Sequence, residues 1–466
     1  FLMSKDAPNT LLHQSQNSRL RTNSDFERLN FFIRSEYKPT QGTSLGLSYN
    51  FTTAEKGVPS EEYLYAKDAR FWRYSDVNRN VVTFNAEQYL GQNLIFRTTL
   101  WGDFFNQQID AYDSTYSTIK TKQKDKDFTF GNRFALEYEL FEKNWLTAVF
   151  NSYYSLHKEK IDNNSEDEFS QFTYSAGIEY KSSYKDVNFV AGATYDGCVT
   201  PKTGIYKDSE GETFQDFGLF VGSRYYLTDE ISTFANISRR TRFPTLREAY
   251  SGALGKFVPN PDLGAETGLL IDWGISYTSE IVNLNITAFG SFYDDLIIRI
   301  KVPKDHPLYD PQYPNMRMRD NLAEATVYGA ELGFNLFPNS NILFYGNATF
   351  MKSEGKEQGS KVEHLEYKPE LQASLIAGYK FDFGLTPQIE LEHIGKQYAL
   401  NAISGKFDEL ENYTLLNFRI GYNFDLYGNN IEVFARINNI TDEYFLTQIG
   451  LPGYGRTFTC GISVRY

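Results

Sequence analysis

Apolar and polar residues alternate along the stretch from Ile431 to Tyr466, and the same alternation recurs elsewhere in the chain. In its second half, apolar side chains occupy every second position, at Phe458, Cys460, Ile462, Val464 and Tyr466. In its first half the same spacing is seen at Ile431, Val433, Ala435 and Ile437. Because successive side chains of a strand point to opposite faces, this period of two predicts two strands, each with one apolar face.

Each of these strands is long enough to cross a lipid bilayer, since a tilted membrane strand needs roughly 9–11 residues. The same alternation recurs in other segments, at residues 282–288, 371–380 and 416–423. The sequence therefore predicts an all-β protein, a transmembrane antiparallel β-barrel. On this prediction one set of side chains faces lipid and the alternate set faces the lumen. The lipid-facing set includes Val282, Leu284, Ile286, Phe418, Ile420, Ile462 and Val464.

Two kinds of connection alternate between the predicted strands, as they do in outer-membrane barrels, where short turns face the periplasm and long loops face outside. The short turns are rich in Gly, Asn, Asp, Ser and Pro, which tight turns favour. They are Pro39 to Thr43, Gly91 to Asn93, Phe141 to Asn144, Ser182 to Asp186, Thr228 to Glu230, Thr278 to Glu280, Pro338 to Asn341, Phe383 to Gly384 and Leu426 to Asn429. The long connections include 52–69, 198–213, 241–265, 303–321 and 351–366.

About nineteen strands fit between Arg28 and Tyr466, and this odd number begins and ends on a strand that runs toward the short turns. Bacterial single-chain barrels have even strand numbers. We therefore expect about three further strands upstream, which gives about twenty-two, the size of plugged outer-membrane transporters. On this view residues 1–466 are one barrel domain, truncated at its amino terminus, without a plug.

Composition fits a barrel wall better than a set of soluble domains. Phe, Tyr and Trp make up 16% of the residues, yet the mean hydropathy is −0.46 and no run approaches the roughly 18 apolar residues of a helical span. The net charge of −13, without a concentrated basic patch, disfavours nucleic acid as a partner. The two cysteines, Cys198 and Cys460, are too few for a disulfide framework, and we expect both thiols to be free.

Four segments, in order, resemble motifs of the TonB-dependent outer-membrane receptors. Residues 238–250 (SRRTRFPTLREAY) resemble the family's Phe-Arg-x-Pro-x-Leu-x-Glu-x-Tyr segment, and residues 260–267 (NPDLGAET) resemble its Asn-Pro-x-Leu-x-x-Glu segment. Residues 437–444 (INNITDEY) resemble its Asn-Leu-x-Asp-x-x-Tyr box. Residues 452–458 (PGYGRTF) are similar to the Pro-Gly-Arg-x-Phe entry to the last strand, with two extra residues before Arg456. Residues 23–32, with Tyr49 and residues 55–59, also look like the early barrel of that family.

This resemblance implies a receptor in the bacterial outer membrane that captures a scarce ligand with its external loops. It further implies import of that ligand, a ferric siderophore or similar metal chelate, driven by the TonB energy-coupling complex of the inner membrane. A plug domain, absent from these residues, would block the lumen. Two alternatives remain open: a passive porin-like channel, and a surface receptor for glycans or peptides that works with a lipoprotein partner.

Candidate ligand-binding residues lie in the long connections and at the strand ends next to them. Arg239, Arg240 and Arg242 could attract an anionic chelate, or pair with carboxylates of a plug or a neighbouring loop. Tyr63 and Trp72 belong to an aromatic run that could line a ligand vestibule or form an interfacial girdle.

His306 and Tyr309 lie in a loop that also holds Met316 and Met318. This set could serve a soft metal or haem, but no spacing fixes a metal site there. The other histidines, His13, His157, His364 and His393, are scattered along the sequence and predict no cluster. The sequence also contains no phosphate-binding glycine loop and no HExxH motif. We therefore predict no enzyme, no resident metal and no cofactor.

Overall fold

A computed structural model describes residues 22–465, except 62–63, 65–68, 205–210, 253–256, 310, 312–315, 358–359, 363, 402–403 and 405. Within these residues one sheet of 21 strands, antiparallel except for one short parallel pairing, forms nearly the whole molecule. Two of its members, β11 (Phe257–Val258) and β16 (Ser360–Val362), are short additions, which leaves nineteen long strands in the described chain. The predictions of an all-β barrel and of about nineteen strands are confirmed. None of the described helices is long and apolar enough to cross a membrane.

The strands are named in chain order. The first half of the wall consists of β1 (Phe26–Thr40), β2 (Thr43–Val58), β3 (Trp72–Tyr89), β4 (Leu94–Tyr112), β5 (Ile119–Phe141), β6 (Asn144–Ile161), β7 (Asp167–Tyr184), β8 (Val187–Thr203), β9 (Thr213–Tyr226) and β10 (Ile231–Arg242). The second half consists of β12 (Glu266–Thr278), β13 (Val282–Lys301), β14 (Arg317–Leu336), β15 (Ile342–Glu357), β17 (Leu371–Tyr379), β18 (Leu385–Ile394), β21 (Tyr413–Leu426), β22 (Asn429–Asn438) and β25 (Thr457–Arg465). The connections contain α1 (Leu246–Ala249), β11 (Phe257–Val258), β16 (Ser360–Val362), β19 (Gln397–Leu400), β20 (Phe407–Leu410), β23 (Leu446–Gln448) and β24 (Leu451–Pro452).

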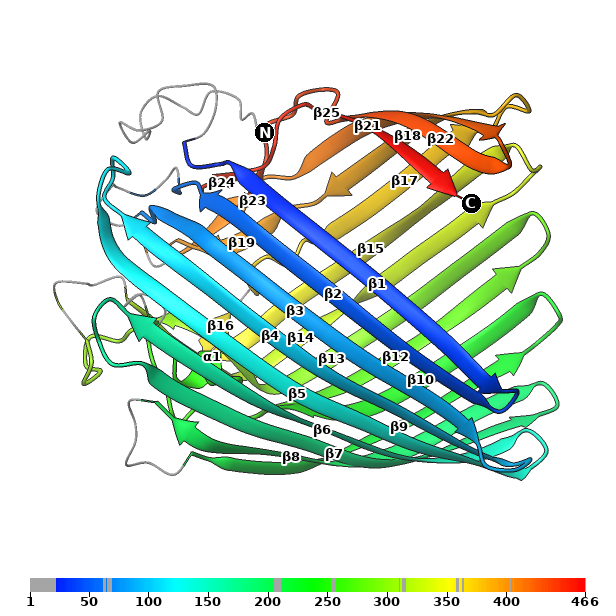
Figure 1. Ribbon diagram of the computed structural model, residues 1–466, viewed down its shortest axis with the longest axis horizontal. Helices are drawn as coiled ribbons and strands as arrows, with labels where there is room; N and C mark the ends of the chain where they lie inside the picture. Colours follow the sequence, from blue (N-terminus) through cyan, green and yellow to red (C-terminus); the bar gives the residue numbers. More distant parts are fainter. Residues whose placement is uncertain are drawn as a thin grey trace.

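Short turns and long connections lie at opposite ends of the wall, the turns at the right of Figure 1 and the long connections at the left. Each of the nine predicted short turns falls at a hairpin tip of the described chain. Several tips need a left-handed backbone, which Gly91 (φ 100°) and Gly384 (φ 97°) adopt without steric cost. This asymmetry identifies the left end of the figure as the extracellular mouth.

The two faces of the wall differ in polarity, and the strand register shows how. Ile275 of β12 stands directly opposite Ile286 of β13, and both are exposed on the outer face. In the next pair, Ser276 stands opposite Asn285 on the inner face. Farther along the wall, Arg419 forms an ion pair of 2.5 Å with Glu432, and Arg436 forms one of 2.5 Å with Glu390. An apolar exterior and a lumen of paired charges are the arrangement that a lipid environment requires.

The closing strand follows the predicted alternation. Phe458, Ile462 and Val464 of β25 are exposed on the outer face, and their partners on β22 are Ile437, Val433 and Ile431. Cys460 is exposed and Cys198 is buried, and both are free thiols. Tyr466 lies outside the described residues.

The two end strands of the sheet each have one neighbour among the described residues. β1 pairs with β2, and β25 pairs with β22. Every residue of β1 is exposed, in contrast to the strands in the middle of the sheet. The backbone groups along the free sides of β1 and β25 are therefore available to further strands.

Several strands are much longer than a membrane crossing needs, with 23 residues in β5 and 20 in β13. Where β5 to β7 approach the mouth, their outer face becomes charged, with Lys126 3.5 Å from Glu166 and Lys158 3.4 Å from Glu168. Because such charges are costly in hydrocarbon, this part of the wall projects beyond the lipid into water.

Candidate functional site

The connection between β10 and β12 folds inward and packs against the inner wall near the mouth. Its helix α1 contributes Leu246 and Ala249 to an apolar cluster with Tyr250 and with Phe169 of β7. Phe169 stands opposite His157 of β6 on the lumen side. From β7, the side-chain amide of Gln171 donates a 2.9 Å hydrogen bond to the carbonyl of Pro244. These contacts fix the connection as part of the lumen lining.

A capping box starts α1. The Thr245 hydroxyl accepts a hydrogen bond from the backbone N–H of Glu248, and the Glu248 carboxylate accepts one from the backbone N–H of Thr245. The signature Thr-x-x-Glu is visible in the sequence, so this start could have been predicted. Burial would raise the pKa of Glu248, but hydrogen bonds from Arg242 and Thr245 outweigh it, and the pKa lies below the ordinary value. Burial raises the pKa of Tyr250 in the same connection.

The far side of the connection is fastened to β14. The short strand β11 pairs in parallel with the start of β14. The guanidinium of Arg319 lies 4.6 Å from the ring centre of Phe257 and donates a 2.9 Å hydrogen bond to the carbonyl of Arg247. The Asn260 side chain donates a 2.9 Å hydrogen bond to the carbonyl of Arg319. The family-like segments 238–250 and 260–267 thus anchor an inward-folded loop to two walls of the barrel.

The structure gives the three candidate arginines different surroundings. Arg242 binds the carboxylates of Glu266 and Glu248, the latter at 2.8 Å. Arg239 lies where the β9–β10 ladder ends and binds Asp216 with two hydrogen bonds, of 2.9 and 3.1 Å. Arg240 stands opposite Gly268 on the lumen side, is exposed, and has no ion pair within the part of the chain that the structure describes. Contact of any of the three arginines with a ligand stays a prediction.

The aromatic candidates are only partly described. Tyr63 lies outside the described residues. Trp72 begins β3 and is half-buried, and the guanidinium of Arg70 lies 5.5 Å from its ring centre. A register shift between Tyr74 and Asp76 places Trp72 opposite Ala111, on the same side as the lumen-facing Ile109. This position fits a vestibule lining, and a role in binding stays a prediction.

His306 and Tyr309 lie in one turn beyond β13. The backbone N–H of Tyr309 donates to the carbonyl of His306 at 2.9 Å, and the His306 ring accepts from the backbone N–H of Leu308 at 3.2 Å. Tyr309 and Met316 pack against buried Val258, Val302 and Met318. The structure thus uses Tyr309 and both methionines in an apolar cluster, and among the described residues His306 belongs to no cluster of His, Cys, Asp and Glu side chains that could hold a metal. Their proposed contact with a ligand stays a prediction.

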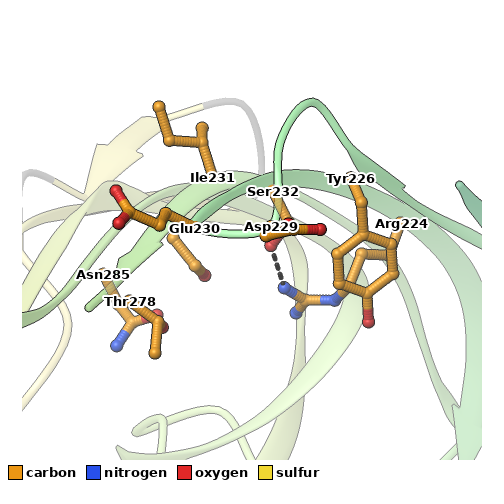
Figure 2. A pocket seen from close by; sticks show the side chains of 9 residues that line it. Arg224, Tyr226, Asp229, Glu230, Ile231, Ser232, Thr278 and Asn285 are labelled. Carbon is orange, nitrogen blue, oxygen red and sulfur yellow. Dashed lines mark hydrogen bonds between the residues drawn. The ribbon is translucent and has the colours of Figure 1, made fainter. Parts of the chain in front are cut away.

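A cavity of about 390 Å³ lies at the opposite end of the wall, beside the β9–β10 turn. Figure 2 shows Arg224 hydrogen-bonded to Ser232, with Glu230, Thr278 and Asn285 around the opening. It is at the turn end, far along the strands from the loop candidates. We therefore do not assign this cavity to an extracellular ligand.

One group of side chains on the inner wall is not predicted by the sequence pattern. Asp125, His157 and Glu159 bring their oxygen and nitrogen atoms within 4.8 Å of one another. They belong to neighbouring strands, in which Asp125 stands directly opposite Glu159. Alternation within residues 124–127 (KDKD) and 157–159 (HKE) shows that each strand places its acidic residues on one face. It does not show that the two strands pair and bring these residues together.

An apolar outer face, a charged lumen, short turns at one end and long loops at the other define a β-barrel protein of the outer membrane. The family model described as "TonB dependent receptor-like, beta-barrel" matches residues 5–440. The chain belongs to this family, as its motifs had indicated, and its place is the outer membrane.

Solved structures with the same fold agree. The copper transporter OprC has a TM-score of 0.77 at 14% identity, over 94% of this chain and 72% of that one. The FrpB iron transporter from Neisseria meningitidis has a TM-score of 0.75 at 12% identity, over 99% of this chain and 74% of that one. BauA, the ferric preacinetobactin receptor from Acinetobacter baumannii, has a TM-score of 0.73 at 14% identity, over 95% and 72%. At these identities the likeness concerns the fold.

Proposed function

We propose that this chain is the barrel of a receptor that binds a scarce extracellular metal chelate, such as a ferric siderophore, and imports it by TonB-coupled active transport. The observation that carries the proposal is the mouth of the barrel, where the end of β10, next to the inward-folded loop, presents Arg240 to the lumen with no carboxylate partner in the described chain. Ferric siderophores commonly carry carboxylate, phenolate or other anionic groups, which an exposed guanidinium attracts.

The family supports the same proposal. Among the similar structures are a copper transporter, an iron transporter and a ferric siderophore receptor. We infer that a plug domain fills the lumen of the receptor, since a barrel with this many strands is otherwise wide enough to leak. Coupling to TonB would act through that plug, and the wall would serve as a rigid frame. Transport of this kind needs no chemical step, and we propose no enzymatic activity.

Growth of a deletion strain tests the proposal. The strain would receive iron chelates, cobalamin, haem or glycans as its limiting nutrient, with the complete gene supplied on a plasmid. We expect the gene to restore growth on one or more iron chelates and to have no effect on glycans. Restored growth on glycans alone would contradict the proposal and favour the surface receptor that works with a lipoprotein. A matched plasmid with Arg240→Glu should weaken rescue at limiting chelate concentrations.

A further inference from the structure

Four ionisable side chains meet on the lumen side of β5 and β6, below the inward-folded loop. Asp125 stands directly opposite Glu159, and Asp127 stands directly opposite His157. The ring Nδ1 of His157 is hydrogen-bonded to the Asp127 carboxylate, and the ring Nε2 lies 3.9 Å from Glu159 Oε2. Two consecutive cross-strand pairs therefore form one compact group.

The group carries more negative charge than its protein surroundings balance. Asp125 is 4% exposed and Glu159 is 6% exposed. Across the described residues, no Lys or Arg forms an ion pair with Asp125, Asp127 or Glu159, and His157 is their one basic neighbour. Burying a carboxylate without a compensating charge is costly. Three carboxylates around a single imidazole thus leave room for a cation.

The neighbours of the group hold its carboxylates in place. The Gln107 side chain donates a 2.6 Å hydrogen bond to Asp125 Oδ2, and the Gln123 amide donates to Asp125 Oδ1 at 2.8 Å and to Glu159 Oε2 at 2.9 Å. From the inward-folded loop, the Ser251 hydroxyl donates a 3.0 Å hydrogen bond to the same Glu159 oxygen. The carboxylates are therefore oriented before any ion arrives.

The histidine is oriented in the way that metal sites require. In most such sites one ring nitrogen binds the metal and the other donates to a carboxylate or carbonyl, which fixes the ring. Asp127 takes this second place on His157 and leaves Nε2 on the side of Glu159. This histidine arrangement is independent of the charge excess, and both lead to the same conclusion.

We propose that Asp125, His157 and Glu159 form a binding site for a divalent transition-metal ion such as Zn²⁺ or Mn²⁺. A set of one imidazole and two carboxylates suits these ions, since the carboxylates favour Mn²⁺ and the imidazole favours Zn²⁺. The ligand atoms already lie within 4.8 Å of one another, so rotation of side chains is enough to close them around an ion. The Gln123 amide, which now joins the two carboxylates, can offer its oxygen instead of its nitrogen by turning over.

The site has a structural consequence for the mouth. Ser251 joins Glu159 to the loop that contains α1, and Phe169 of the loop's apolar cluster packs 5.6 Å from the His157 ring, centre to centre. A bound ion would therefore tie the inward-folded loop to β5 and β6. The charged outer face at Lys126 and Lys158 places these strand rows above the hydrocarbon, so the ion can enter from water. The proposal does not depend on which ligand the receptor imports.

Metal titration of the purified, full-length protein in detergent tests the site. After dialysis against EDTA, wild type should bind one Zn²⁺ by calorimetry, and His157→Gln and Glu159→Gln should each weaken binding more than tenfold. Asp127→Asn, which alters the orientation of His157, should weaken it about 10- to 100-fold. His393→Gln and Glu142→Gln are matched controls, because His393 contacts a threonine hydroxyl and Glu142 is exposed in the turn at the other end of the β5–β6 hairpin. Heat-modifiable migration on gels verifies that each variant is folded.

A second measurement needs no variant. Electron spin echo spectra of Mn²⁺ bound to the wild-type protein should show coupling to one imidazole nitrogen. An absence of stoichiometric binding by wild type would overturn the proposal and leave the group as a protonated ion-pair network. Equal binding by wild type and the ligand variants, or a Mn²⁺ spectrum with oxygen ligands alone, would overturn it as well.

Discussion

Arg242 and Glu266 stand directly opposite each other at the mouth end of the β10–β12 ladder, and their side chains form a two-point ion pair. Glu266 is 7% exposed and also accepts a 2.6 Å hydrogen bond from the backbone N–H of Ile297. The third nitrogen of Arg242 binds Glu248 in the capping box of α1. One guanidinium thus joins three elements of the mouth.

Replacing Arg242 with alanine should loosen the inward-folded loop, because it leaves the buried Glu266 carboxylate without its cation. We expect a loss of about 1–3 kcal/mol in the free energy of local opening. Limited proteolysis of the folded barrel should then show faster cleavage within residues 243–265. Arg240→Ala is the matched control, and a loop equally resistant in both variants would show that the ion pair does not hold it.

Arg240, in contrast to Arg242, is expected to contribute to ligand binding and not to the stability of the mouth. Replacing it with glutamate should leave the thermal stability of the barrel unchanged, because its guanidinium has no ion pair within the described structure. The affinity for an anionic chelate should fall about tenfold or more, since reversing an exposed charge near a ligand changes the binding energy by about 1–2 kcal/mol. Equilibrium binding at two salt concentrations measures this, and the difference should shrink at high salt. Unchanged affinity would remove Arg240 from the ligand site.

The two faces of the wall can be tested with single cysteines in a background without Cys198 and Cys460. Spin labels at 284 and 462 should report lipid, and labels at 283 and 463 should report water. The register supports this prediction, because Ile462 is 71% exposed on the apolar outer face and Ser463 stands opposite Glu432. Reversed polarity at both pairs of sites would mean that the strand register is wrong by one residue.

Acid should release the start of α1. The pKa of Glu248 is lowered in the folded state, so its contribution to stability is present above the ordinary glutamate value and is lost as the pH falls through the folded value. Hydrogen exchange of amides 245–250, corrected for intrinsic rates, should therefore accelerate below about pH 4. Glu248→Ala, which removes the capping carboxylate, should exchange fast at every pH. A wild-type profile that shows no acceleration would exclude the capping box as the acid-sensitive element.

The strands of the barrel wall could be predicted from the sequence because their side-chain orientation and turns depend on residues that are close in sequence. Alternation within each strand predicted which face Ile286 and Ile462 occupy, and the turn residues at Gly91 and Gly384 marked the hairpin tips. The count of nineteen strands followed from these two signals. Strand faces and turns depend on residues that are neighbours in the sequence, so they can be predicted from the local residue pattern alone.

The mouth could not be predicted in the same way, because its contacts join distant parts of the chain. A register shift beside Ser75 turns Trp72 toward the lumen, and no local sequence pattern predicts that shift. The scattered positions of the histidines in the sequence predict no cluster at His157, although strand pairing places it beside Asp127 and near Asp125. Arg239, Arg240 and Arg242 form one run in the sequence, yet Arg239 pairs with Asp216, 23 positions away, and Arg242 pairs with Glu266, 24 positions away, while Arg240 has no ion pair in the described chain.

Uptake of a radiolabelled ferric chelate by cells that make the receptor distinguishes active import from a passive channel. Two strains would be compared, one with and one without TonB, each before and after the proton gradient is collapsed. We predict saturable uptake that requires both TonB and the gradient. Uptake that persists without TonB and rises in proportion to chelate concentration would contradict active import and identify a passive channel.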